Sequence, residues 1–176
     1  MIEIILGVIA GITLLLLIIT IISNRFRFAV IKIEKAEEDI NIYLQKKKDL
    51  LEKTCPIIKK ELKLEEFLNE IDDITDDLNN FKKNNYLKKL SNELYKTIDE
   101  NEKLYKSDSL MSIINSLNDN EENIVGAIKF YNDTIVDYNK LIISFPTNMI
   151  ALFKRYKKKE FYDNEKRETF EILNEK

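Results

Sequence analysis

The chain has 176 residues, of which 34% are charged and 44% hydrophobic, and its formal net charge is −3. This small net charge argues against a nucleic-acid-binding protein, which normally carries a marked basic excess on one face. The chain has no histidine, which excludes histidine-based catalytic triads, the common zinc sites and Glu-x-x-His di-iron sites. It has a single cysteine, so no intramolecular disulfide can form. Three glycines and two prolines are few for this length, and they predict an all-α protein with long helices.

Residues 4–22 form an uncharged, strongly apolar stretch. As a helix with a rise of about 1.5 Å per residue, this stretch reaches about 28 Å, which matches the hydrocarbon core of a bilayer. A cleaved signal peptide is disfavoured, because no lysine or arginine precedes the stretch and no small-residue cleavage site follows it. The sequence therefore predicts that residues 1–24 are an uncleaved, single-pass transmembrane anchor.

The charges that flank this stretch predict its orientation. Four basic residues lie between positions 25 and 35, and none precedes the stretch. By the positive-inside rule, the N-terminus lies outside the cell membrane and residues 23–176 lie in the cytoplasm. Gly7 and Gly11, one turn apart, form a small-x-x-x-small pattern on which a second helix could pack. The ordinary glycine and alanine content of membrane helices is the favoured explanation of that pattern.

Residues 25–153 are expected to form a cytoplasmic, antiparallel bundle of three long helices, or of four. The first helix continues the anchor without a loop, because apolar residues recur at helical spacing from Ile33 to Ile58 and again from Leu64 to Phe81. Proline removes a backbone donor and disfavours helix at the preceding residue. We therefore expect one long helix that is kinked at Pro56, since no turn residues surround it.

The rest of the bundle follows from two breaks. Residues 79–85 contain four asparagines and predict a turn before a second helix, whose apolar positions run from Leu87 to Ile98. Asp108 or Ser109 is expected to cap a third helix, whose apolar seam extends to Phe145, stops at Pro146 and has a polar gap near residues 120–121. Residues 154–176 are expected to be a basic and charged C-terminal tail.

Three parts of the sequence are candidate sites. Asp72, Asp73, Asp76 and Asp77 place two acidic pairs on one face of the expected helix, where a divalent cation could bind, but a solvated face is favoured. The basic run 154–159 could attract anionic lipid only if it lies near the membrane, which a four-helix arrangement allows and a three-helix one does not; a solvated run is favoured. Cys55 is interpreted as a small apolar residue at the kink rather than a reactive thiol.

Paired Tyr-Asn residues give the clearest family signal. Tyr131-Asn132 and Tyr138-Asn139, followed by Phe145-Pro146, resemble the repeated Tyr-Asn pairs and Phe-Pro stop of the LemA family. The apolar and acidic pattern of residues 110–124 and the segment 36–50 are similar to this family as well, so that the resemblance covers roughly residues 1–162. The sequence departs from the family pattern at Glu37, Glu52 and Ile128, where the family has Trp, Pro and Arg.

The resemblance implies a bacterial single-pass membrane protein with a cytoplasmic helical bundle and no established catalytic activity. We therefore expect an interaction or scaffold module that associates with a protein partner or with copies of itself, and that is not an enzyme and uses no cofactor, metal or small-molecule substrate. Tyr131 and Tyr138 share one helix face, with Asn132 and Asn139 beside them to bridge neighbouring helices. The alternative is a membrane-associated sensor or regulatory subunit that binds a cation or anionic lipid.

Overall fold

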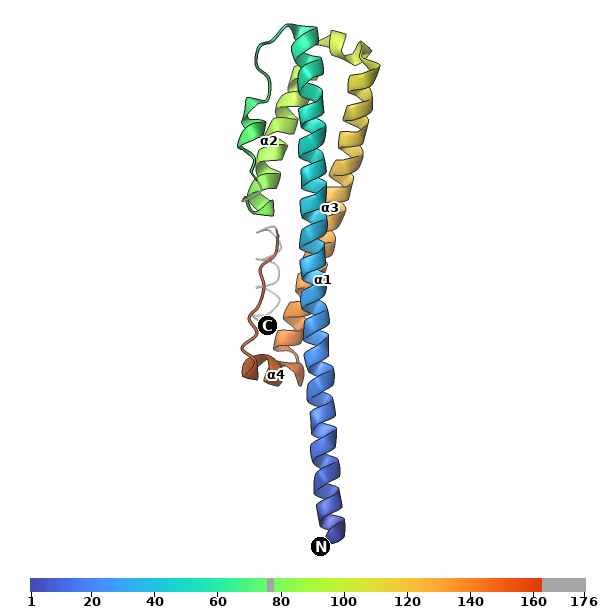
Figure 1. Cartoon of the computed structure of the whole chain (residues 1–176), viewed down its shortest axis with the longest axis vertical. Helices are drawn as coiled ribbons and strands as arrows, with labels where there is room; N and C mark the ends of the chain where they lie inside the picture. The colour runs from blue at the N-terminus through green and yellow to red at the C-terminus, as the bar shows by residue number, and fades with distance from the viewer. Residues whose placement is uncertain (76–77, 163–176) are drawn as a thin grey trace, which may run out of the picture. The chain divides into compact units, whose positions relative to one another are not determined.

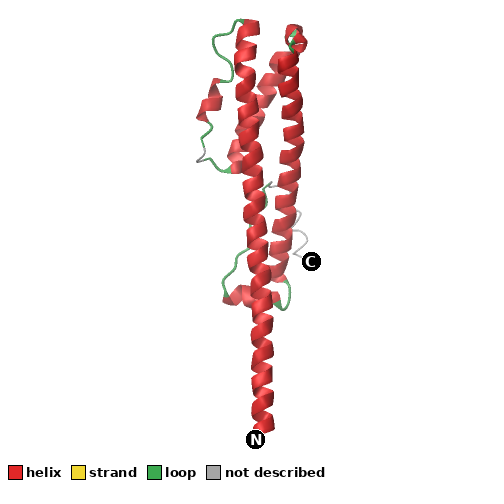
Figure 2. Ribbon diagram, turned by 45° about the vertical axis from the view of Figure 1, so that its right-hand side comes forward, coloured by secondary structure: helices red, strands yellow, loops and turns green. Residues whose placement is uncertain are grey.

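The computed structural model of the chain describes residues 1–75 and 78–162, in which helices and loops are present and strands are not (Figure 1; Figure 2). This confirms the predicted all-α class. The described residues divide into two compact units: a terminal unit, formed by residues 1–35 and 130–162, and a middle unit, residues 36–129. The elements are α1 (Ile2–Leu62), the short 3₁₀ helix η1 (Asn69–Asp73), α2 (Asn80–Asp99), the 3₁₀ helix η2 (Glu102–Lys106), α3 (Asp108–Ile143) and α4 (Thr147–Phe153).

Helix α1 continues from the apolar N-terminal stretch through Pro56 and ends at Leu62, so the predicted continuation beyond residue 62 is wrong. Lys63 and Leu68 adopt positive φ angles of 54° and 52°, a left-handed backbone that cannot continue a right-handed helix. Leu68 and three further apolar residues of this segment are nevertheless buried, in the loop and in η1: Phe67, Ile71 and Ile74. The spacing of these residues resembles that of a helix because they are buried, although no α-helix forms there.

In the middle unit, α1, α2 and α3 pack around apolar side chains. The segment after Leu62 returns along α1, where Lys48 Nζ donates a 2.8 Å hydrogen bond to the carbonyl of Ile74. Helix α2 therefore begins beside the earlier part of α1, where Asn80 Nδ2 donates to the carbonyl of Glu37 at 3.0 Å. Helix α3 then runs back in the opposite direction (Figure 1). The buried residues of α2 and α3 in this unit include Leu87, Leu90, Leu94, Ile98, Leu110, Ile114, Leu117 and Ile124.

The asparagine-rich segment 79–85 starts α2 rather than forming a turn. Asn79 caps the helix, and its Oδ1 accepts a 2.9 Å hydrogen bond from the backbone N–H of Lys82. Asparagine is among the best N-cap residues, because its side chain satisfies an amide that has no partner in the first turn. Helix α3 begins at the predicted break, but there the Oγ of Ser107, rather than Asp108 or Ser109, accepts from the N–H of Leu110 at 3.4 Å.

In the terminal unit, the first part of α1, the end of α3 and α4 share one core. Its buried members include Ile22, Phe26 and Ile33 from α1, Ile135 and Tyr138 from α3, and Ala151 from α4. Helix α3 ends at Ile143, and the chain then turns back into α4. Helix α4 lies beside α1, and the N-terminal, apolar part of α1 extends beyond this contact without a neighbouring helix (Figure 1; Figure 2). Among the described residues, only α1 contains a segment long and apolar enough to span a membrane, and none of that segment is buried.

Candidate functional site

The asparagines of the Tyr-Asn repeat bind the chain that follows α4. Asn139 forms two 2.9 Å hydrogen bonds with the backbone of Lys159: its Nδ2 donates to the carbonyl, and its Oδ1 accepts from the N–H. Asn132 Oδ1 accepts from the N–H of Tyr162 at 2.8 Å. Both asparagines are buried on α3. They therefore bridge to residues 154–162, here called the C-terminal segment, and not to a neighbouring helix as the sequence suggested.

The tyrosines of the repeat contribute aromatic packing to the same place. The ring of Tyr138 meets that of Phe26 edge to face, with centroids 6.1 Å apart, and Phe26 stacks on Tyr156 at 4.7 Å. Tyr131 meets Tyr162 edge to face at 6.2 Å. Burial raises the pKa of the Tyr138 hydroxyl, and the neighbouring Tyr156 raises it further. The C-terminal segment is thus fixed through both its backbone and its rings.

The Phe-Pro pair marks the turn into α4. Phe145, the last position of the predicted seam, is not buried: α3 ends two residues earlier, at Ile143, and Phe145 is 80% exposed. After Pro146, the hydroxyl of Thr147 donates to the carbonyls of Leu141 and Ser144 and so ties the start of α4 to the end of α3. The Phe-Pro pair therefore lies where the chain reverses, and the Phe145 ring is exposed.

The basic run begins next to the apolar stretch of α1. Lys154 Nζ donates a 2.9 Å hydrogen bond to the Oγ of Ser23, the residue that directly follows the uncharged stretch. The sequence left open whether this run approaches that stretch. The chain reversal between α3 and α4 brings it there.

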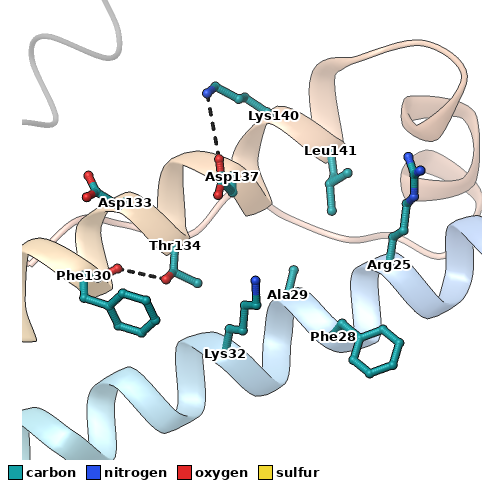
Figure 3. Close-up of a pocket in the computed structure, with 10 residues that line it drawn as sticks. All are labelled: Arg25, Phe28, Ala29, Lys32, Phe130, Asp133, Thr134, Asp137, Lys140 and Leu141. Atoms are coloured by element: carbon teal, nitrogen blue, oxygen red, sulfur yellow. Dashed lines mark hydrogen bonds and ion pairs between the residues drawn. The ribbon is translucent and has the colours of Figure 1, made fainter.

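A cleft of about 510 Å³ lies between α1 and α3 of the terminal unit (Figure 3). Arg25 and Lys32 extend from α1 toward α3, while Lys140 forms a 3.9 Å ion pair with Asp137 on α3 (Figure 3). The hydroxyl of Thr134 is already engaged, because it donates to the carbonyl of Phe130. The lining is thus mixed in charge and partly aromatic, as is usual for small binding clefts.

The other residues singled out from the sequence show no ligand geometry where the structure describes them. Asp72 and Asp73 lie on η1, whereas Asp76 and Asp77 fall outside the described residues, and within the described part no three acidic or thiol groups gather as metal ligands. Burial raises the pKa of the half-buried Cys55 thiol, an effect that Lys59 opposes. Gly7 and Gly11 have no atoms of the chain within 4 Å of an added Cβ, so their packing on a second helix stays a prediction.

An ion pair with a buried lysine in the middle unit was not predicted from the sequence. Lys47 is 1% exposed, and its Nζ lies 2.6 Å from Oε2 of Glu121. Beside it, buried Asn120 donates from Nδ2 to the carbonyl of Tyr43 at 2.9 Å. Two features of the sequence pointed to this pair: the polar gap in the α3 seam near residues 120–121, and the lysine run 46–48 among the apolar positions of α1.

Comparison with known proteins finds a family but no individual relative. No curated protein and no solved structure matches the chain. The family model described as "LemA family" matches residues 36–172, which is more than half of the chain and includes the Tyr-Asn repeat and the C-terminal segment. The match begins after the apolar stretch of α1. The chain belongs to the LemA family.

Proposed function

We propose that this protein is a single-pass membrane protein whose helical domain is a cytoplasmic interaction module without catalytic activity. One observation carries the proposal: α1 is a single helix, Ile2–Leu62, whose apolar first third, residues 2–21, is exposed while its remainder packs in the two units. An exposed apolar segment of this length is stable in a bilayer and unstable in water. Membership of the LemA family, which is not known as an enzyme family, supports a role in binding.

The orientation rests on the basic residues that follow the apolar stretch. Arg25, Arg27 and Lys32 on α1 and the basic C-terminal segment all belong to the terminal unit, on the C-terminal side of that stretch. Basic residues close to a span are retained on the cytoplasmic side. The proposal therefore places residue 3 outside and the helical domain inside the cell membrane.

Anchoring and orientation can be tested with single cysteines. In a Cys55→Ser background, Glu122→Cys offers an exposed thiol in the middle unit, and Glu3→Cys is the matched variant that precedes the apolar stretch. A membrane-impermeant maleimide should label position 122 in inside-out vesicles and position 3 in right-side-out vesicles. The reverse pattern would overturn the orientation. Release of the full chain by alkaline carbonate would overturn the anchor.

The interaction role can be tested by crosslinking in intact membranes followed by purification. A stoichiometric partner protein, or a crosslinked second copy, is the expected result. Gly7→Leu with Gly11→Leu leaves the fold of one chain free of clashes, because neither position has a neighbour within 4 Å. Loss of the crosslinked copy in this variant would place the contact at the glycines. Recovery of monomers without any crosslinked protein would contradict the interaction role.

A further inference from the structure

Helix α4 is attached to the terminal unit by one face only. Ala151 is buried in the core of that unit with Phe26, and the hydroxyl of Thr147 donates to carbonyls at the end of α3. Positions 147 and 151 are one helical turn apart and therefore lie on the same side of α4. That side faces the protein.

The other face of α4 exposes large apolar side chains. Met149, Leu152 and Phe153 lie three and four residues apart and are 64%, 82% and 89% exposed, and Phe145, just before the helix, is 80% exposed. These four residues are called the α4 patch. Single exposed apolar residues are common on protein surfaces, whereas a cluster of this kind marks a contact surface.

The α4 patch lies at the depth where the apolar stretch of α1 ends. Lys154, adjacent to Phe153, is hydrogen-bonded to Ser23, and Ser23 follows the last residue of the stretch. Because residues 4–22 match the thickness of a hydrocarbon core, Ser23 comes to the interface between hydrocarbon and headgroups. Figure 1 shows α4 beside α1 at the start of the part that continues alone.

Basic residues border the patch. Arg155 and Lys157 follow it in the C-terminal segment and are exposed; Arg27, one helical turn after Ser23 on α1, is exposed as well. An apolar face with a basic border is typical of segments that lie in the interface of an anionic membrane. A neutral protein surface would not require these charges.

We infer that the α4 patch inserts into the anionic lipid surface of the same membrane that α1 crosses. This inference rests on the proposed membrane anchoring. The membrane is the occupant that the contacts favour, because the hydrogen bond between Lys154 and Ser23 holds the patch at the end of the span, and because the border charges complement anionic headgroups. The terminal unit is then held at the membrane by the anchor and by a second, peripheral contact.

The test uses a tryptophan as a depth probe, because the chain has none. The full chain with Phe153→Trp is reconstituted into vesicles of phosphatidylcholine and phosphatidylglycerol, in which the phosphatidylcholine is brominated near the headgroup end of its acyl chains. The matched control is Phe130→Trp, which lies with Lys32 in the cleft, about 14 Å along α1 from Ser23. The tryptophan at position 153 should show blue-shifted emission that the bromolipid quenches. That at position 130 should not.

The other outcomes separate this inference from the proposed anchor. Solvent-like, unquenched emission at position 153 in chains that resist carbonate extraction overturns the α4 contact and leaves the anchor standing. Blue-shifted emission without quenching assigns the patch to a second copy or another protein and also overturns the inference. Quenching in chains that carbonate releases overturns the anchor and supports lipid contact by α4.

The charge requirement is tested with the same probe. Arg155→Glu with Lys157→Glu should lower the quenched fraction toward its value in vesicles that lack phosphatidylglycerol. Lys88→Glu with Lys103→Glu, at exposed positions of the middle unit, makes the same change in net charge and should leave quenching unchanged. An equal loss of quenching in both double variants contradicts a specific basic border.

Discussion

The ammonium of Lys47 is buried 2.6 Å from the Oε2 of Glu121, which itself is 43% exposed. The two residues join α1 to α3 in the middle unit, across 74 positions of sequence. A buried cation that loses its partner keeps its desolvation penalty, whereas an apolar residue of similar shape in its place does not carry one. Removing the carboxylate alone should therefore destabilise the folded chain more than removing both charges does.

The first prediction compares the two sides of this pair. Glu121→Gln should lower the free energy of unfolding by about 1–3 kcal/mol, because it leaves the ammonium of Lys47 without its charged acceptor. Lys47→Met with Glu121→Gln should recover much of this loss. Urea unfolding of the full chain in detergent, followed by circular dichroism, measures both. The neighbouring exposed Glu122→Gln is the control, and an equal loss there would contradict the assignment.

The second prediction concerns the double hydrogen bond between Asn139 and Lys159. Asn139→Ala removes both bonds and leaves a backbone amide and carbonyl without their partners, so the C-terminal segment should detach more often. Limited trypsin digestion should then cut after Lys157–Lys159 several times faster than in the parent chain. Asn115→Ala, at an exposed position of α3, should leave the rate unchanged. Identical digestion of both variants would show that the hydrogen bonds do not hold the segment.

A third prediction addresses the aromatic stack. Phe26 is fully buried between Tyr138 and Tyr156, so Phe26→Ala should cost about 3–5 kcal/mol of stability through the cavity that it leaves. The exposed Phe28→Ala, two positions further along α1, should change stability by less than about 0.5 kcal/mol. Thermal unfolding of the full chain in detergent distinguishes the two. Equal melting temperatures would mean that the stack contributes nothing.

The fourth prediction uses the proline inside α1. Pro56 is exposed and lies within the helix. Because proline has no N–H, the carbonyl of Glu52 accepts no helical hydrogen bond from position 56. Pro56→Ala restores this hydrogen bond and should raise stability by up to about 3 kcal/mol. The exposed Lys53→Ala, on the same helix, serves as control. A lower unfolding midpoint for Pro56→Ala would indicate that the proline conformation is needed there.

The fifth prediction concerns alkaline pH. Because burial raises the pKa of Tyr138 in the folded chain, this tyrosine ionises more readily after unfolding. Its contribution to stability is therefore fully present below the unfolded pKa of about 10 and is lost as the pH rises through the folded pKa. Tyr138→Phe should weaken the loss of stability above this pH. Parallel stability profiles for both chains between neutral and strongly alkaline pH would contradict the prediction.

Local patterns in the sequence were enough to predict the helices and the apolar stretch. These patterns involve residues only a few positions apart: the hydropathy of residues 4–22, the apolar spacing from Leu87 to Ile98 and the apolar repeat along α3. The structure has a helix at each of the three places. Helix ends were less well predicted. A spacing that continued to Phe81 could not show that the backbone turns left-handed at Lys63, because buried loops and buried helices produce similar apolar patterns.

The tertiary structure alone decided which distant residues meet. Lys154 and Ser23 are 131 positions apart, and whether they meet depends on the chain reversal after α3 and on the packing of Ala151 against α1. The Tyr-Asn repeat was recognised as a family motif, yet its binding partner is an extended segment with no periodicity to reveal it. Helix formation is governed by neighbours along the chain, whereas the position of α4 at the end of the apolar stretch is governed by long-range burial and hydrogen bonding, which no local pattern records.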